Sequence, residues 1–113
     1  MSQTPIDDAA FAELQASAGA DFVNELVDTF FEEAPRMLEE LRSAAAEGRA
    51  DAFRRAAHSL KSNANTFGAL DLGALARELE LGGAPAGGDT SAVAALEQEY
   101  ARVAARLREL RGG

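Results

Sequence analysis

The sequence contains no cysteine, and it has only one histidine and one lysine among its 113 residues. Without cysteine, the chain can form no disulfide, no thiolate metal site and no thiol nucleophile. A single histidine without cysteine also argues against a structural zinc site, which needs four protein ligands. These absences direct attention to the one imidazole in the chain, His58.

Long apolar segments are absent as well. No run of about 18 apolar residues could span a membrane, and the N-terminus lacks the basic and then apolar pattern of a secretory signal. We therefore expect a cytoplasmic protein that binds no membrane. The net charge of −8 argues against binding of nucleic acid. Residues 1–48 carry a net charge of −9 and residues 49–113 a net charge of +1, so His58 lies in the less acidic part.

Five stretches show the apolar spacing of amphipathic helices, and no stretch alternates as a β-strand does. A short first helix should begin near residues 4–8 and end by Gly19. The second should span about residues 21–47, with Asp21 as its cap and a kink at Pro35. The third should run from near Asp51 to near residue 68. Asp71 and residues 89–91 should cap the last two helices, on either side of a flexible loop at residues 82–88.

Amphipathic helices joined by short loops predict the fold class. We expect an all-α protein in which the last four helices form an antiparallel four-helix bundle. The first helix is too short to be stable alone and should lie across one end of that bundle. A chain of this length is enough for one domain and too short for two, so residues 1–113 should form a single domain.

The third predicted helix has two distinct faces. Its apolar residues recur at spacings of four and three and should face the core; they are Phe53, Ala57, Leu60, Ala64 and Phe67. His58 lies on the opposite, polar face with Arg54, Arg55, Lys61, Ser62 and Asn65. A solitary surface histidine is most often an ordinary solvated side chain. The cations and the small residue around this one instead favour a site for an anion at the imidazole.

These residues carry a resemblance to a known family. The segment His58-Ser59-Leu60-Lys61-Ser62, followed by Thr66-Phe67-Gly68-Ala69, resembles the motif of the histidine-containing phosphotransfer (HPt) domain of two-component phosphorelay signalling. The resemblance extends over essentially the whole chain, because the helices before and after the motif fit the family layout. Ser62 departs from the commoner glycine, but both residues are small.

The resemblance implies that His58 is phosphorylated. A neutral imidazole is a good nucleophile and can take a phosphoryl group on one ring nitrogen while the other donates a hydrogen bond. Lys61, one turn away, can supply a cation for the phosphoryl oxygens. In the family, the position 22 residues after the histidine accepts the hydrogen bond from the ring, and here that position is Glu80. Spacing alone would equally allow Glu80 to be an exposed carboxylate.

The docking surface for a partner should surround His58. The second helix has a broad apolar arc near residues 22–31, which the first helix could cover or a partner could bind. We expect the partner to contact Arg54, Arg55, Ser62, Asn65, Gly68, Phe11 and Phe31, although Gly68 could instead mark a close approach of helices.

The sequence offers no Gly-rich phosphate loop, catalytic triad or carboxylate metal cluster. We therefore expect a phosphoryl carrier without a cofactor of its own rather than an enzyme. A response-regulator receiver domain would supply the phosphoaspartate and the magnesium ion, and a sensor or hybrid histidine kinase would be a further partner. The carrier should be monomeric.

Two other functions fit the same residues. One is a helical adaptor that binds a receiver or kinase without carrying phosphate, and the other is the N-terminal phosphorylatable module of a chemotaxis-type kinase. The start at Met1 and the end soon after the last helix favour a free-standing protein.

Overall fold

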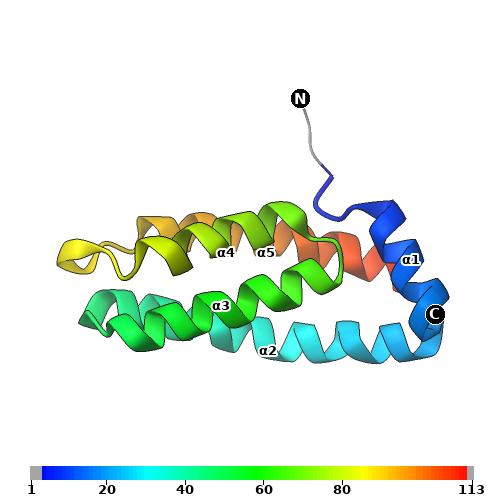
Figure 1. The fold of residues 1–113 in the computed structure, drawn as a ribbon, viewed down its shortest axis with the longest axis horizontal. Coiled ribbons are helices and arrows are strands. Elements are labelled where there is room, and N and C mark those ends of the chain that lie inside the picture. Colours follow the sequence, from blue (N-terminus) through cyan, green and yellow to red (C-terminus); the bar gives the residue numbers. More distant parts are fainter. Residues whose placement is uncertain (1–3, 112–113) are drawn as a thin grey trace.

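Five α-helices and one 3-10 turn account for nearly all of residues 4–111, which this computed structural model describes. The helices are α1 (Asp8–Ala18), α2 (Ala20–Glu47), α3 (Ala50–Thr66), α4 (Leu70–Gly82) and α5 (Ser91–Leu110), with the 3-10 turn η1 at Ala86–Gly88. Helices α2 to α5 lie along the long axis and alternate in direction, whereas α1 lies at the end where α2 begins (Figure 1). The predicted all-α bundle with an extra N-terminal helix is confirmed, and residues 4–111 contain no strand.

The core contains the apolar faces that the sequence predicts. In α3 the seam residues Phe53, Ala57, Leu60 and Ala64 are all fully buried, and Phe67 just beyond the helix is nearly so. The ring of Phe30 from α2 lies 5.3 Å from that of Phe67 and 5.7 Å from that of Tyr100 in α5. These aromatic contacts join α2 and α5 to the end of α3 and help to fix which face of α3 points outward.

Helix α1 is held against the turn between α3 and α4. Asp7 caps α1, because its Oδ1 accepts hydrogen bonds from the backbone N–H groups of Ala9 (3.0 Å) and Ala10 (3.2 Å). The N–H of Asp7 donates to the carbonyl of Gly68 at 2.8 Å. Gly68 has φ of 78°, and a Cβ there would lie 3.0 Å from that of Ala10. Glycine is needed at this position for both its backbone conformation and the close approach of α1.

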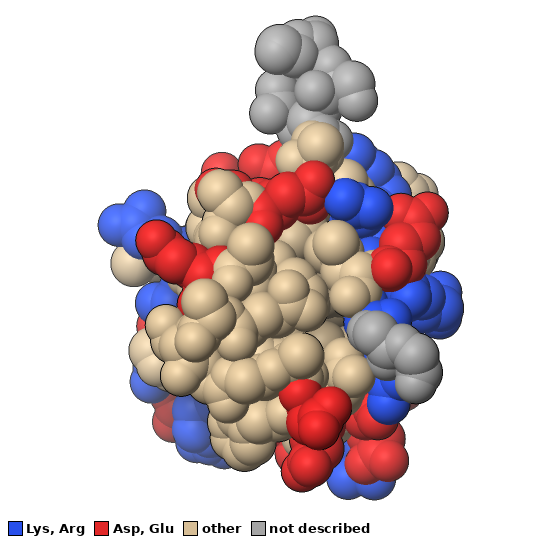
Figure 2. Space-filling model, turned by 90° about the vertical axis from the view of Figure 1, so that its right-hand side faces the viewer, with Lys and Arg blue, Asp and Glu red and all other residues tan. Residues whose placement is uncertain are grey.

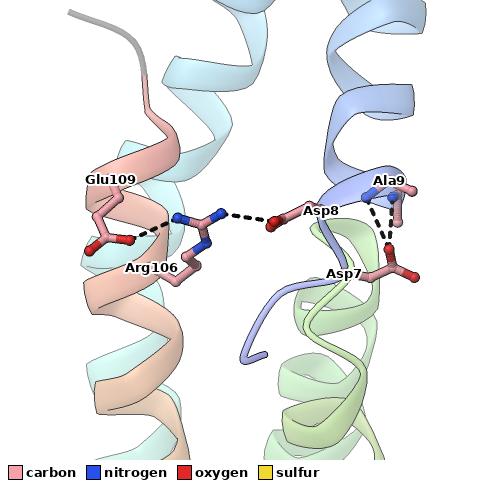
Figure 3. A network of polar contacts seen from close by, with 6 residues as sticks. Asp7, Asp8, Ala9, Arg106 and Glu109 are labelled. Carbon is pink, nitrogen blue, oxygen red and sulfur yellow. Dashed lines mark hydrogen bonds and ion pairs between the residues drawn. The ribbon is translucent and has the colours of Figure 1, made fainter. Parts of the chain in front are cut away.

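A guanidinium group ties α1 to the last helix. Arg106 of α5 bonds Asp8 at 2.9 Å through Nη2 and Glu109 at 2.8 Å through Nη1, as Figure 3 shows.

Two of the residues expected to contact a partner are buried instead. Phe11 is 1% exposed in the core under α1, and Gly68 is buried beneath the start of the same helix. The prediction that they line a docking surface is wrong, because α1 closes onto the bundle with its own apolar side.

Two predicted helix caps are also wrong. Asp21 and Asp71 lie inside the first turns of α2 and α4, and the residues at the cap positions are Gly19 and Ala69. Gly19, with φ of 95°, both ends α1 and precedes α2, so no further residue is left to act as a linker. The two carboxylates still favour their helices through the positive end of the helix dipole. As predicted, α2 continues through Pro35.

The end of the bundle near α1 presents a broad uncharged surface with charged side chains of both signs around it (Figure 2). Helix α2 starts at this end, and Phe22 in its first turn is 51% exposed. The apolar arc of α2 is thus only partly covered by α1. No helix in residues 4–111 is long and apolar enough to cross a membrane.

Candidate functional site

His58 is displayed on the outer face of α3, where 58% of its side chain is exposed. Its Nδ1 lies 2.8 Å from Oε2 of Glu80, which is in the last turn of α4. Helices α3 and α4 pack side by side along the bundle, so a residue near the end of α4 reaches the middle of α3 (Figure 1). The structure therefore brings together the histidine and the carboxylate expected to orient it.

Glu80 also binds Lys61. The ammonium Nζ lies 2.8 Å from Oε1 of Glu80, and the side chains of Lys61 and Glu80 are only 24% and 19% exposed. One carboxylate thus joins two side chains of α3 that are three residues apart. The hydrogen bonds from Lys61 and, secondly, from His58 lower the pKa of the Glu80 carboxyl below its ordinary value of 4.5. Glu80 is consequently ionised at neutral pH.

The ionised state of Glu80 determines the tautomer of His58. A carboxylate can only accept hydrogen bonds, so the imidazole must donate from Nδ1. In a neutral ring that carries its proton on Nδ1, the lone pair is on Nε2. The exposed ring nitrogen is therefore the one that can attack an electrophile, and the hydrogen bond to Glu80 holds the ring in that orientation.

A shallow depression of about 340 Å³ lies beside the imidazole. Its lining consists of Arg54, Arg55, His58, Ser59 and Glu80. Arg54 bonds Oδ1 of Asp51 at 3.0 Å through Nη2. Arg55 is exposed, and within residues 4–111 its side chain has no hydrogen bond or ion pair. The depression can hold a small anion beside the imidazole.

The remaining predicted docking residues are more scattered. Ser62 is exposed one turn after His58, and its carbonyl accepts a hydrogen bond from Thr66 Oγ1 at 3.0 Å. Asn65 is exposed but lies against α4, where a Cβ added to Gly73 would be 2.2 Å from Asn65 Oδ1. Phe31 is half-buried on α2, with the guanidinium of Arg108 5.5 Å from its ring centre. Of these residues, Ser62 is the nearest to His58 in sequence, and it lies one turn further along the exposed face of α3.

Gly73 is a residue of the site region that the sequence reasoning missed. It is buried in α4 at the point where Asn65 of α3 crosses, and this contact lets the two helices approach closely. A glycine inside an otherwise apolar helical pattern was the available signal, because glycine weakens a helix unless close packing requires it. No group of three or more possible metal ligands occurs within the described residues.

Comparisons with known proteins found a matching family model and a similar solved structure. The family model for the Hpt domain matches residues 25–106. The crystal structure of histidine-containing phosphotransfer protein B (HptB) from Pseudomonas aeruginosa PAO1 is similar, with a TM-score of 0.81 and 32% sequence identity. The match covers 97% of this chain and 96% of that one. No curated protein matches the sequence.

Proposed function

Because the chain belongs to the Hpt domain family of histidine phosphotransfer proteins, we propose that it carries a phosphoryl group on Nε2 of His58. The donor is the phosphoaspartate of a receiver domain, and the acceptor is the aspartate of a response-regulator receiver. The observation that carries this assignment is the 2.8 Å contact between His58 Nδ1 and Glu80, which leaves the exposed Nε2 as the nucleophile.

In the accepting step, the lone pair of Nε2 attacks the phosphorus of the acyl phosphate. The bond between phosphorus and the aspartate oxygen breaks, and its electron pair returns to the aspartate carboxylate. The Nδ1 proton stays on the ring, so the product is a phosphorylated imidazolium. Glu80 lies 2.8 Å from that proton and stabilises the new positive charge.

The returning step is the reverse of this reaction. A carboxylate oxygen of the second receiver attacks phosphorus, and the bond from phosphorus to Nε2 breaks as the ring leaves as neutral imidazole. The retained Nδ1 proton favours this departure, because neutral imidazole is a better leaving group than imidazolate. One hydrogen bond to Glu80 therefore serves both directions.

The exposure of the site fits a carrier that depends on a partner for the chemistry. His58 is on the convex surface of a helix, where a receiver can place an aspartate in line with Nε2. The receiver would also bring the magnesium ion that neutralises the charge developing on the phosphoryl oxygens.

A transfer assay tests the proposal. A receiver domain labelled on its aspartate is mixed with the chain and then with a second, unlabelled receiver, while binding is followed separately by titration calorimetry. We expect acid-labile, base-stable label on the parent chain and its onward transfer, and no label on the His58→Gln variant. Binding of receivers without any label would instead support an adaptor that carries no phosphate.

A further inference from the structure

Three cations flank His58 on α3, Arg54 and Arg55 one turn before it and Lys61 one turn after it, and their surroundings differ. Arg54 is already in an ion pair. The ammonium of Lys61, on the later turn, is held by Glu80 at 2.8 Å, and the side chain is 24% exposed. The guanidinium of Arg55, on the earlier turn, is exposed and makes no hydrogen bond or ion pair within residues 4–111. Arg55 is thus the cation beside the imidazole that could bind a new anion without breaking a contact.

The open space beside the ring lies on the side of Arg55. Side chains on an α-helix lean toward its N-terminus, so the imidazole of His58 covers the turn that contains residues 54 and 55. The depression next to the ring agrees with this direction, because Arg54 and Arg55 line it and Lys61 and Ser62 do not. The space beside the imidazole that could receive a phosphoryl group is thus bordered by the two arginines.

Lys61 is poorly placed to leave its partner. If its ammonium moved to a phosphoryl group, the carboxylate of Glu80 would lose its ion pair with Lys61 while a dianion was added to the same site. Arg55 can approach the phosphoryl oxygens with two parallel N–H groups, a geometry that suits phosphate better than a single ammonium.

We propose that Arg55 binds the phosphoryl oxygens on Nε2 of His58, while Lys61 acts as a positioning residue that holds Glu80 against Nδ1. This inference rests on the proposed phosphorylation of His58. It reassigns the role that the sequence suggested for Lys61, and it turns Arg55 from a contact for a partner into part of the phosphoryl site.

The test uses a small chemical donor, so that no receiver is needed. Phosphoramidate phosphorylates imidazole when Nε2 attacks its phosphorus, the bond between phosphorus and the amine breaks, and ammonia leaves. The second ionisation of the phosphoryl group is then followed by ³¹P NMR titration in the parent and in the Arg55→Gln, Lys61→Gln and Arg54→Gln variants. Arg54→Gln is the matched control, because Arg54 lines the same depression but is paired with Asp51.

A nearby cation favours the dianion and lowers the phosphoryl pKa, so its removal should raise that pKa. We expect Arg55→Gln to raise it by about half a unit or more, and each of the other two variants by clearly less. The inference is overturned if Arg55→Gln matches Arg54→Gln, or if Lys61→Gln gives the largest shift.

The outcomes of this experiment and of the transfer assay are separable. If phosphoramidate labels His58 and the Arg55 shift appears, but no receiver exchanges phosphate with the chain, the phosphoryl site stands and the relay function does not. If phosphoramidate places no phosphoryl group on His58 in the folded parent, the inference about Arg55 is wrong as well.

Discussion

Nδ1 of His58 in α3 lies 2.8 Å from Oε2 of Glu80 in α4, although 22 residues separate them in sequence. The second oxygen of the same carboxylate lies 2.8 Å from Nζ of Lys61. Glu80 therefore has three effects at once: it sets the tautomer of the ring, fixes the ring against α4, and holds Lys61 beside it. Substitutions at Glu80 and at the helix contacts can separate these effects from the stability of the bundle.

Replacing Glu80 by Gln should change how stability depends on pH. The pKa of Glu80 is lowered in the folded chain, chiefly by Lys61 and then by His58, so the unfolded chain binds more protons at acidic pH. The stability contributed by this carboxylate is complete above its ordinary pKa of 4.5 and is lost as pH falls through the lower folded value. The difference in the free energy of unfolding between the parent and the Glu80→Gln variant should thus become smaller as the pH falls. Urea unfolding of both proteins between about pH 7 and about pH 3 measures it; a gap that widens toward low pH would contradict the pairing.

Gly68→Ala should destabilise the junction of α1 with the bundle. Alanine at φ of 78° is strained, and its Cβ would press on Ala10 at 3.0 Å and on the carbonyl of Asp7 at 3.2 Å. We expect a loss of about 1–3 kcal/mol in the free energy of unfolding. Gly82→Ala is the control, since a Cβ at that helical position meets nothing within 4 Å and alanine favours helix by up to about 1 kcal/mol. Equal effects of the two variants in urea unfolding would show that α1 does not depend on Gly68.

Phe53→Ala should test the burial of the inner face of α3. The side chain is fully buried, and truncating such a phenylalanine removes about 3–5 kcal/mol of stability. Phe22→Ala removes the same atoms from a side chain that is 51% exposed, so we expect a much smaller loss of about 1 kcal/mol or less. Thermal or urea unfolding of the pair distinguishes them. Similar losses would mean that α3 is rotated relative to the core.

Ser62→Trp should weaken docking without disturbing the fold. Ser62 is exposed one turn after His58, and a large side chain there leans back over the imidazole. Receiver binding by titration calorimetry and phosphoryl transfer by label chase should fall together, in both directions of transfer. Ser62→Ala is the control and should behave as the parent does. A Trp variant that binds and transfers normally would place the docking surface elsewhere.

The sequence predicted the bundle well because each long helix has an apolar seam that can be read at helical spacing. The seam of α3 from Phe53 to Phe67 also placed His58 on the outer face, as the structure shows. The partner of His58 could not be derived from spacing, since Glu80 meets it only through the packing of α4 on α3; the family resemblance identified it.

The features that the sequence did not reveal have a common physical origin. Phe11 belongs to a short helix whose apolar residues do not reveal which surface they will cover, and α1 folded them into the core. The spacing placed Lys61 one turn from His58, but it could not show that the ammonium pairs with a carboxylate from another helix. Contacts between helices decide both cases, and a single helical pattern does not contain them.

The central claim is that Nε2 of His58, with Nδ1 protonated and bound to Glu80, carries the phosphoryl group. The most direct measurement is ¹⁵N and ³¹P NMR of the isotopically labelled chain after phosphorylation by a receiver domain. The account predicts coupling between phosphorus and Nε2 of His58, together with a proton on Nδ1. Phosphorus bonded to Nδ1, or to any residue other than His58, would contradict it.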